Sequence, residues 1–349
     1  MDNSFNVQNL VRDNVKNLMP YSSARDEFSG DRALDLIFLD ANENPHENGV
    51  NRYPDPHQGT LKKELANIKK VSEDSILLGN GSDEILDLIF RAFCEPKVDN
   101  IITLPPTYGM YKVLANINDV QNREVWLTHD YEPDVDKILD TANDTSKLLF
   151  MCTPNNPTGN SFPEAKVERL LEHFKGLVVI DEAYIDFSNH NSWLERLGEF
   201  PNLLVTQTLS KAYGMAGIRL GICYASPPII SILKKIKPPY NVNQLTQGKA
   251  LQRIRDTATV EREIGSIIAG REILLNAIET IGFVEKVYRT DANFVLVKVD
   301  DANKRYAQLL EMGIIVRNRS GQPLCENTLR FTVGTQQENE RLINVLKDI

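Results

Sequence analysis

Lys211 and the hydroxyl residues beside it are the first candidates for chemistry in this sequence. Thr208 and Ser210 stand three and one positions before the lysine, and Arg219 stands eight positions after it. An amine nucleophile among donors that suit an anionic group is what a lysine requires if it forms a Schiff base beside a phosphate. The alternative is an ordinary surface lysine in a loop shaped by glycines, since short motifs over-predict function.

A carboxylate thirty residues before Lys211 favours the first interpretation. The run Leu177–Asp181 is typical of a buried apolar strand, and it ends in an acid. A carboxylate in that position is costly to desolvate unless it meets a cation. The N–H of a pyridinium ring is such a cation, and Asp181 would keep the ring protonated and therefore able to accept electrons.

Two turns at the same expected edge of the sheet carry groups that could hold a ring. Asn156 lies in the turn Thr153–Gly159, where its amide could donate to a phenolate oxygen. A plain turn is the alternative, because Pro, Asn and Gly are common in loops. Tyr108, in the turn Pro105–Gly109, could stack on a flat ring. Ligands collect at the carboxyl edge of an α/β sheet, so both turns are candidate parts of one site.

A third turn, Leu78–Glu84, joins a short apolar run to an amphipathic segment. The free backbone N–H groups and the dipole at the start of a helix there would favour a phosphate. The turn is not a dinucleotide-binding fingerprint, because Glu84 stands where the third glycine of that pattern belongs. A nicotinamide-dependent oxidoreductase is therefore a disfavoured alternative.

The elements that would position these residues alternate between Asp55 and Ser226. Short apolar runs predict strands at Ile101–Leu104, Lys147–Thr153, Leu177–Asp181, Leu203–Gln207 and Gly221–Ala225. Segments of helical period predict helices at Thr60–Lys69, Asp83–Cys94, Tyr108–Ile117 and Glu164–Phe174. Because continuous apolar runs indicate strands buried on both faces, we expect an α/β fold with a mostly parallel central sheet.

The pattern changes after Pro238 and Pro239. A long polar helical stretch, Gln244–Ile281, comes first. The segments that follow predict strand, helix, strand, strand and helix, at Phe294–Val299, Ala302–Met312, Ile314–Arg317, Leu329–Val333 and Gln337–Leu346. This order predicts a smaller α+β domain. We expect an N-terminal arm with part of the small domain over 1–50, a large domain over 51–240, and a connecting helix with the small domain over 241–349.

The composition of the 349 residues is that of an ordinary globular protein, with 42% hydrophobic and 25% charged residues. The formal net charge of −9 disfavours a nucleic-acid surface, which needs a basic face. The apolar runs are far shorter than the roughly 20 residues that span a membrane. The first residues have neither the basic start nor the apolar stretch of an export signal.

The cysteines and histidines predict neither a disulfide framework nor a metal site. The four cysteines are scattered without CxxC spacing, which is typical of a reduced interior. The five histidines show no pairing at i and i+4, so we expect no metal. We accordingly expect a cytoplasmic location.

Taken in order along the chain, these residues resemble the fold-type I pyridoxal-phosphate enzymes, and among them the histidinol-phosphate aminotransferase family. The resemblance covers nearly the whole length. The segments that carry it beyond the general cofactor signature are Met19–Tyr21, Ser23–Arg25, Ala41–Pro45, Asn51–Asp55, Arg91–Pro96, Pro105–Tyr111 and Leu329–Gly334.

The resemblance implies a role for each of the residues above toward pyridoxal 5'-phosphate. Lys211 would form the Schiff base, and Asp181 would pair with the ring nitrogen. Asn156 and Tyr184 would contact the 3′ oxygen of the ring, and Tyr108 would stack on its face. The cofactor phosphate would be held by Gly81, Ser82, Asp83, Thr208, Ser210 and Arg219.

The resemblance also implies a homodimer and a substrate site. Tyr53 would reach the phosphate of the cofactor in the neighbouring subunit. Arg330 would anchor the α-carboxylate of the amino donor, because a guanidinium presents paired donors to two oxygens. Tyr21 and Arg317 would lie near the substrate phosphate and Asn44 at the wall of the site. Arg319, two residues beyond Arg317, leaves the phosphate ligand open; a solvated surface arginine is its alternative.

The reaction implied is a step of histidine biosynthesis, in which imidazole acetol phosphate and L-glutamate become L-histidinol phosphate and 2-oxoglutarate. An aromatic aminotransferase or a threonine-phosphate decarboxylase on the same scaffold would share the cofactor residues, so both stay open as alternatives. An effector-binding module of this fold is disfavoured, because it would need an attached basic DNA-binding segment.

Overall fold

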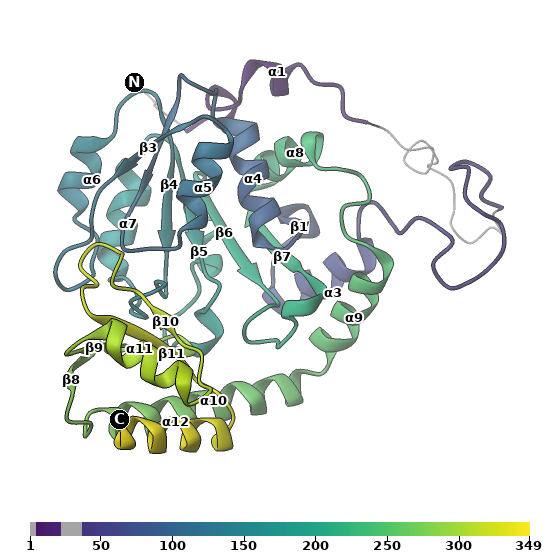
Figure 1. The fold of residues 1–349 in the computed structure, drawn as a ribbon. Helices are drawn as coiled ribbons and strands as arrows, with labels where there is room; N and C mark the ends of the chain where they lie inside the picture. Colours follow the sequence, from purple (N-terminus) through teal and green to yellow (C-terminus); the bar gives the residue numbers. More distant parts are fainter. Residues whose placement is uncertain (1–4, 22–36) are drawn as a thin grey trace.

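The computed structural model describes residues 5–21 and 37–349, and a seven-stranded sheet is its largest element (Figure 1). The strand order is β1-β7-β6-β5-β4-β2-β3, and β7 alone among them runs antiparallel to its neighbours. The strands are β1 (Ile76–Asn80), β2 (Asn100–Thr103), β3 (Gln121–Glu124), β4 (Ser146–Cys152), β5 (Leu177–Asp181), β6 (Leu203–Thr208) and β7 (Leu220–Ala225). The α/β fold with a mostly parallel sheet is confirmed.

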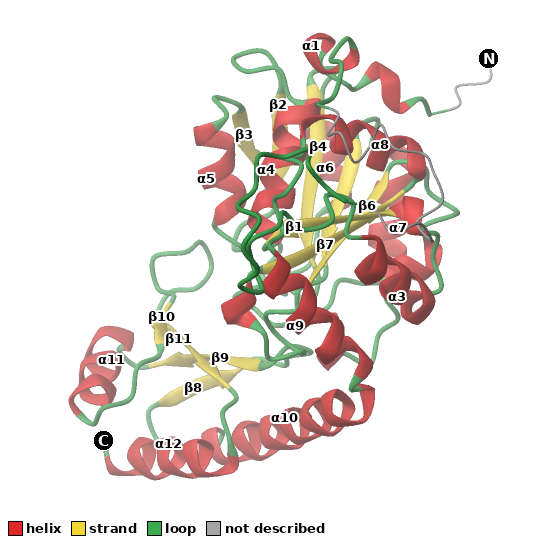
Figure 2. Cartoon of the chain, turned by 90° about the vertical axis from the view of Figure 1, so that its right-hand side faces the viewer, coloured by secondary structure: helices red, strands yellow, loops and turns green. Residues whose placement is uncertain are grey.

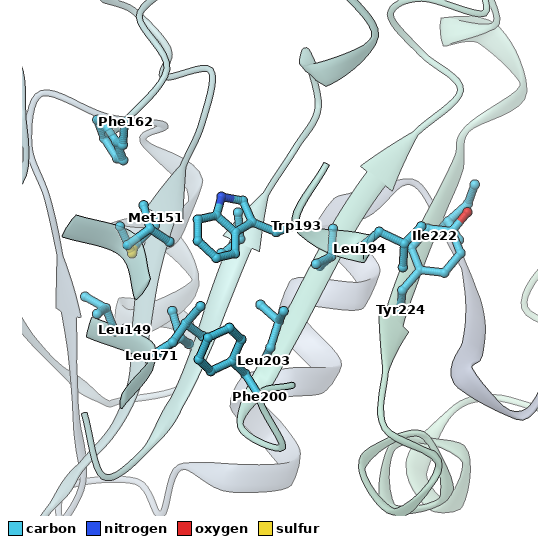
Figure 3. Packing of buried hydrophobic residues seen from close by; sticks show 14 of the residues in the cluster. Leu149, Met151, Phe162, Leu171, Trp193, Leu194, Phe200, Leu203, Ile222 and Tyr224 are labelled. Carbon is cyan, nitrogen blue, oxygen red and sulfur yellow. The ribbon is translucent and has the colours of Figure 1, made fainter. Parts of the chain in front are cut away.

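Helices cover both faces of this sheet, so its strands are buried on both sides. Along β4 the side chains of Leu149 and Met151 belong to one hydrophobic cluster, and those of Leu148 and Phe150 belong to the other. Figure 3 shows the first cluster, in which Trp193 and its neighbours pack over the strands. The helices around the sheet are α1 (Asp13–Lys16), α3 (Gly59–Lys69), α4 (Ser82–Phe93), α5 (Met110–Ile117), α6 (Val135–Thr141), α7 (Glu164–His173) and α8 (Pro227–Ile236).

A second sheet of four antiparallel strands lies toward the C-terminus, in the order β10-β11-β9-β8 (Figure 2). Its strands are β8 (Val284–Val287), β9 (Phe294–Val299), β10 (Arg317–Asn318) and β11 (Thr328–Thr332). The remaining helices are α9 (Gln244–Arg255), α10 (Thr257–Ile278), α11 (Ala302–Glu311) and α12 (Gln336–Asp348). A separate hydrophobic cluster, which includes Leu274, Val297 and Leu346, joins α10, β9 and α12. The domain boundaries at residues 50 and 240 stay a prediction.

Two predicted elements are wrong in detail. The strand expected at Ile314–Arg317 starts only at Arg317, because Gly313 takes a positive φ of 74° and the N–H of Ile314 donates back to Leu309. The stretch expected as one helix over Gln244–Ile281 is two, α9 and α10, which meet at Asp256. Asp favours helix ends, since its side chain competes for backbone hydrogen bonds.

Several elements were not predicted, among them α1, β1, β3, α6, α8 and β8. Strand β3 reads QNRE and β8 reads VEKV, and most of their side chains are accessible to solvent. Edge strands of this kind lack the apolar run by which a central strand is recognised. Within the described residues no helix is both long and apolar enough to cross a membrane.

Candidate active site

The carboxyl ends of β4, β5 and β6 converge with the first turn of α4 on one pocket. Ten of the residues predicted to bind the cofactor line it: Ser82, Asp83, Tyr108, Asn156, Asp181, Tyr184, Thr208, Ser210, Lys211 and Arg219. Two further residues, Cys152 and Ala183, complete the lining. Parallel strands bring their carboxyl ends to one edge of a sheet, which is why residues so distant in sequence meet there.

Asp181 is buried at the end of β5 and lines this pocket. Its Oδ1 accepts the backbone N–H of Ala183 at 3.2 Å, and its Oδ2 accepts a hydroxyl proton at 2.8 Å. Burial raises the pKa of Asp181 to about 6, and these hydrogen bonds oppose the rise. The carboxylate is thus ready to pair with a cation that enters the pocket.

Lys211 follows β6 and lines the pocket. Its Nζ is 5.6 Å from the centre of the Tyr184 ring. Desolvation lowers the pKa of Lys211, and the nearby cation Arg330 lowers it further, while Asp181 acts in the opposite direction. A lysine in this environment becomes a neutral nucleophile at a lower pH than a lysine in water.

A chain of polar contacts links the two sheets above the pocket. The amide Nδ2 of Asn156 donates to the Tyr184 hydroxyl at 3.4 Å, and Arg330 on β11 donates to Oδ1 of the same Asn156. The guanidinium of Arg330 also lies 4.9 Å from the centre of the Phe294 ring on β9. The contact between Asn156 and Arg330 could not be predicted from the sequence. It depends on how the second sheet packs against the first, and the two residues are far apart along the chain.

The start of α4 also lines the pocket, through Ser82 and Asp83. Gly81 precedes the helix with φ of 78°, and an added Cβ there would lie 2.7 Å from a guanidinium nitrogen of Arg219. Arg219 also lies 3.9 Å from Asp83. The Thr208 hydroxyl donates to the carbonyl of Leu220 and accepts the N–H of Ser210. A helix start, hydroxyls and an arginine together suit a phosphate.

Tyr108 lines one side of the pocket and donates from its hydroxyl to Asp83 at 3.0 Å. Burial and the neighbouring Asp83 raise its pKa above the ordinary tyrosine value. The phenol therefore stays neutral, and its ring is held by the hydrogen bond at the edge of the pocket. The position agrees with a residue that stacks on a flat ring.

The three arginines expected near the substrate all come from the second sheet and the loop that joins β10 to β11. Burial lowers the pKa of Arg330 to about 10, with Arg319 as the next contributor and Arg317 a smaller one. The Nε atoms of Arg330 and Arg319 are buried and lack a hydrogen-bond partner within the described part of the chain. Arg317 is exposed at the edge of a larger groove that Arg330 also lines. Arg319 is thus a partly buried residue rather than a solvated surface arginine.

Six predicted site residues do not line this pocket. Gly81 directly precedes α4, and Arg317 and Arg330 line the larger groove. The other three are Tyr53, Asn44 and Tyr21. Tyr53 stacks on Tyr240 at 4.5 Å, and Asn44 and Tyr21 are exposed. Residues 37–55 extend away from both sheets (Figure 1). The segment Ser23–Arg25 lies outside the described residues.

Sequence reasoning missed Cys152, Ala183 and Tyr111. Cys152 pairs in register with Asp181, so the end of β4 beside the end of β5 could have identified it. Tyr111 donates the 2.8 Å hydrogen bond to Asp181 from a helix that the sequence did predict, but nothing in the spacing indicated the contact. All four cysteines are buried and free. No group of three or more metal-ligating side chains occurs in residues 5–21 and 37–349.

The sequence is similar over nearly its full length to a known protein family and to named members of that family. Residues 29–346 match the family model for aminotransferase class I and II. A histidinol-phosphate aminotransferase from Flavobacterium johnsoniae is 63% identical over 99% of both chains. The enzyme of the same name from Parabacteroides distasonis is 51% identical over 98% of this chain and 99% of its own.

Solved structures show the same architecture. The histidinol-phosphate aminotransferase from Clostridium acetobutylicum has a TM-score of 0.79 at 26% identity, and the match covers 86% of this chain and 90% of that chain. The one from Sinorhizobium meliloti, in complex with pyridoxal-5'-phosphate, has a TM-score of 0.79 at 23% identity and covers 85% and 82% of the two chains. By the extent of the family match and the identity to these relatives, this chain belongs to the class I and II aminotransferases.

Proposed function

We propose that the chain transfers the amino group of L-glutamate to imidazole acetol phosphate and so forms L-histidinol phosphate and 2-oxoglutarate, a step of histidine biosynthesis. Curated relatives named for this reaction are 50–63% identical over almost the whole length. The observation that carries the proposal is that the amine of Lys211 and the buried carboxylate of Asp181 face the same pocket.

The residues of the pocket fit pyridoxal 5'-phosphate. Aminotransferases of this family use that cofactor, which supplies an electron sink for the carbanion at the amino acid Cα. Asp181 would pair with its ring nitrogen, Asn156 and Tyr184 with its 3′ oxygen, and Tyr108 would stack on its face. Its phosphate would be held by the start of α4 and by the cluster Gly81, Ser82, Asp83, Thr208, Ser210 and Arg219.

The fit rests on charge as well as on shape. The buried carboxylate of Asp181 favours a cation in the pocket, and the start of α4 beside Arg219 favours an anion. The cofactor would supply both charges, a cation at its ring nitrogen and an anion at its phosphate. Gly81 leaves room for Arg219 to approach the helix start, because a side chain at that position would collide with the guanidinium.

Lys211 would hold the cofactor and, once displaced by the amino donor, would move the proton. Its Nζ must be neutral to take the proton from the donor Cα, and the lowered pKa of this lysine favours that state. The same Nζ would deliver that proton to C4′ of the cofactor before 2-oxoglutarate is released, and it would make the two transfers in reverse with the acceptor. Asp181 would keep a proton on the ring nitrogen throughout, and Tyr184 would orient the ring.

The substrate anions would be bound by the arginines of the second sheet. Arg330 would take the α-carboxylate of glutamate, since its Nε is buried without a partner in the described residues. The phosphate of the acceptor would be bound by Arg317, with Tyr21 and Asn44 nearby. Arg319 would add positive charge beside these anions. It lies close enough to Arg330 to lower the pKa of Arg330.

A homodimer is part of the proposal. Tyr53 is exposed and does not line the Lys211 pocket of its own chain, which suits a residue that reaches the cofactor phosphate of a second copy. Sedimentation of the purified chain should give a dimer. Tyr53→Phe should weaken cofactor binding, and full cofactor affinity in that variant would contradict the assignment.

A cytoplasmic location is also proposed. Four buried free thiols suit a reducing compartment. Recovery of the enzyme in the soluble fraction of intact, washed cells would support the location, and recovery in the medium would contradict it.

One assay tests the proposed function against the alternatives. The purified chain is mixed with glutamate and imidazole acetol phosphate while the cofactor absorbance and the release of carbon dioxide are followed. The proposal predicts amino transfer without carbon dioxide, and a large loss of rate for acceptors that lack the phosphate. Carbon dioxide from threonine phosphate, or equal rates with aromatic acceptors, would favour the other two enzymes.

A further inference from the structure

Tyr111 is a buried phenol whose hydroxyl points at the site from below. Its side chain is fully buried, and its hydroxyl donates to Oδ2 of Asp181 at 2.8 Å. The residue does not line the pocket, so it would not touch the cofactor. Its hydroxyl acts on the site through the carboxylate to which it donates.

The ring of Tyr111 is held in place by its neighbours. It stacks on Phe150 of β4 at 4.9 Å and meets the Tyr108 ring edge-on at 5.6 Å. The residue lies in the first turn of α5, directly after the turn that carries Tyr108. The hydroxyl is therefore aimed at Asp181 by rigid packing, and the hydrogen bond costs little conformational entropy.

Asp181 needs a donor in this position. Its other oxygen accepts the N–H of Ala183 at 3.2 Å. Besides Tyr111, the charged or titratable groups that interact with this carboxylate are Asp83, Cys152, Lys211, Tyr108 and Tyr184, and the hydroxyl of Thr206 lowers its pKa. Burial favours the neutral carboxyl, and Asp83 favours it too. A phenol that donates to a carboxylate stabilises the ionised form, because a protonated carboxyl would no longer offer that oxygen as a strong acceptor.

We propose that Tyr111 is a positioning residue that keeps Asp181 ionised and fixes its orientation, so that the carboxylate can hold the ring nitrogen of the cofactor in its protonated form. This inference rests on the proposed function. It assigns to Tyr111 a role in cofactor binding through Asp181 that is separate from the packing of its ring.

Tyr111→Phe tests the proposal, because it removes the hydroxyl and keeps the ring. Loss of a strong hydrogen bond to a buried carboxylate raises the carboxyl pKa by about two units. From about 6 in the parent, a rise of about two units leaves roughly a tenth of Asp181 ionised at pH 7. Binding that requires the ionised carboxylate should weaken by about tenfold.

The matched control is Tyr224→Phe. Tyr224 is likewise fully buried, it lies on β7 (Figure 3), and its hydroxyl has no hydrogen-bond partner within the described residues. Both variants lose one buried phenol oxygen and keep a ring of the same size. Only Tyr111→Phe removes a contact with Asp181.

The experiment titrates the full-length chain, freed of cofactor, with pyridoxal 5'-phosphate and with its 1-deaza analogue, which has carbon in place of the ring nitrogen. At pH 7 we expect Tyr111→Phe to bind the natural cofactor about tenfold more weakly and the analogue within about twofold of the parent. At pH 9, where Asp181 is ionised in parent and variant alike, the difference should shrink to about twofold. Tyr224→Phe should match the parent with both ligands.

Two results would overturn the role of Tyr111. One is cofactor affinity in Tyr111→Phe that stays within about twofold of the parent at pH 7. The other is an equal loss for the cofactor and the analogue, which would mean that the hydroxyl only supports packing. A parent chain that fails to bind pyridoxal 5'-phosphate would instead overturn the proposed function, and that result is read before any variant is compared.

Discussion

Gly221 lies where β7 passes the turn that begins α4, and replacing it with alanine should weaken cofactor binding. An added Cβ would lie 2.4 Å from the backbone nitrogen of Ser82 and 2.5 Å from the carbonyl carbon of Gly81. Both contacts are roughly 1 Å shorter than an ordinary contact between nonbonded atoms. Because the partners are backbone atoms, the turn itself must move by about that distance.

The turn that moves is the one proposed to hold the phosphate. A displacement of about 1 Å in a positioned group can change a rate about a hundredfold, and overpacking costs about 1–3 kcal/mol. We expect Gly221→Ala to bind pyridoxal 5'-phosphate about 10- to 100-fold more weakly. Pyridoxal, which has no phosphate, should bind the variant and the parent alike, because the ring contacts come from β5 and the turn at Asn156.

The assay is equilibrium titration of the cofactor-free chain by absorbance, and Gly217→Ala is the matched control. Gly217 lies in the same segment between Lys211 and β7, and a Cβ there would meet nothing within 4 Å. The control should keep the parent affinity. If Gly221→Ala retains cofactor affinity within threefold, or loses affinity for pyridoxal to the same extent, the phosphate assignment of this turn is wrong.

Three further changes test separate parts of the account. Asp181→Asn should lower turnover by more than about a hundredfold while some cofactor still binds, and steady-state kinetics that match the parent would remove Asp181 from its role. Arg330→Ala should raise the Michaelis constant for glutamate more than that for the phosphorylated acceptor, whereas Arg317→Ala should do the reverse; an unchanged donor constant in the first variant would refute the anchor. Burial lowers the pKa of Lys62 to about 8, so its charge costs the fold stability below about pH 8, and the cost fades as the pH approaches the unfolded value of about 10.5. Lys62→Met should therefore raise the unfolding temperature at pH 7 and have little effect near pH 10, and an equal shift at both pH values would contradict the burial argument.

The sequence predicts the central strands and the residues at their ends well, because burial on both faces leaves a continuous apolar run. Leu177–Asp181 is a strand with the predicted bounds, and Asp181 lies in the pocket as expected. The same holds for Lys211 after β6. A residue that directly follows a recognisable strand is placed by that strand, so its position at the sheet edge can be inferred without a structure.

Contacts between distant elements could not be predicted in this way. Arg330, on the four-stranded sheet, donates a hydrogen bond to Asn156, which follows a strand of the seven-stranded sheet. Tyr111 donates to Asp181 from α5, a helix that packs on the seven-stranded sheet. Edge strands such as β3 escape detection because solvent replaces the apolar neighbours that give a central strand its pattern. The role of Tyr53 depends on a second copy of the chain, and the roles of Tyr21, Asn44 and Tyr53 all stay predictions.

The central claim is that the amine of Lys211 binds the aldehyde of pyridoxal 5'-phosphate. Borohydride reduction of the purified enzyme, followed by proteolysis and mass spectrometry, measures this directly. The account predicts a phosphopyridoxyl group on the peptide that contains Lys211 and on no other. A tag on a different lysine, or no tag on an enzyme that still transfers amino groups, would contradict it.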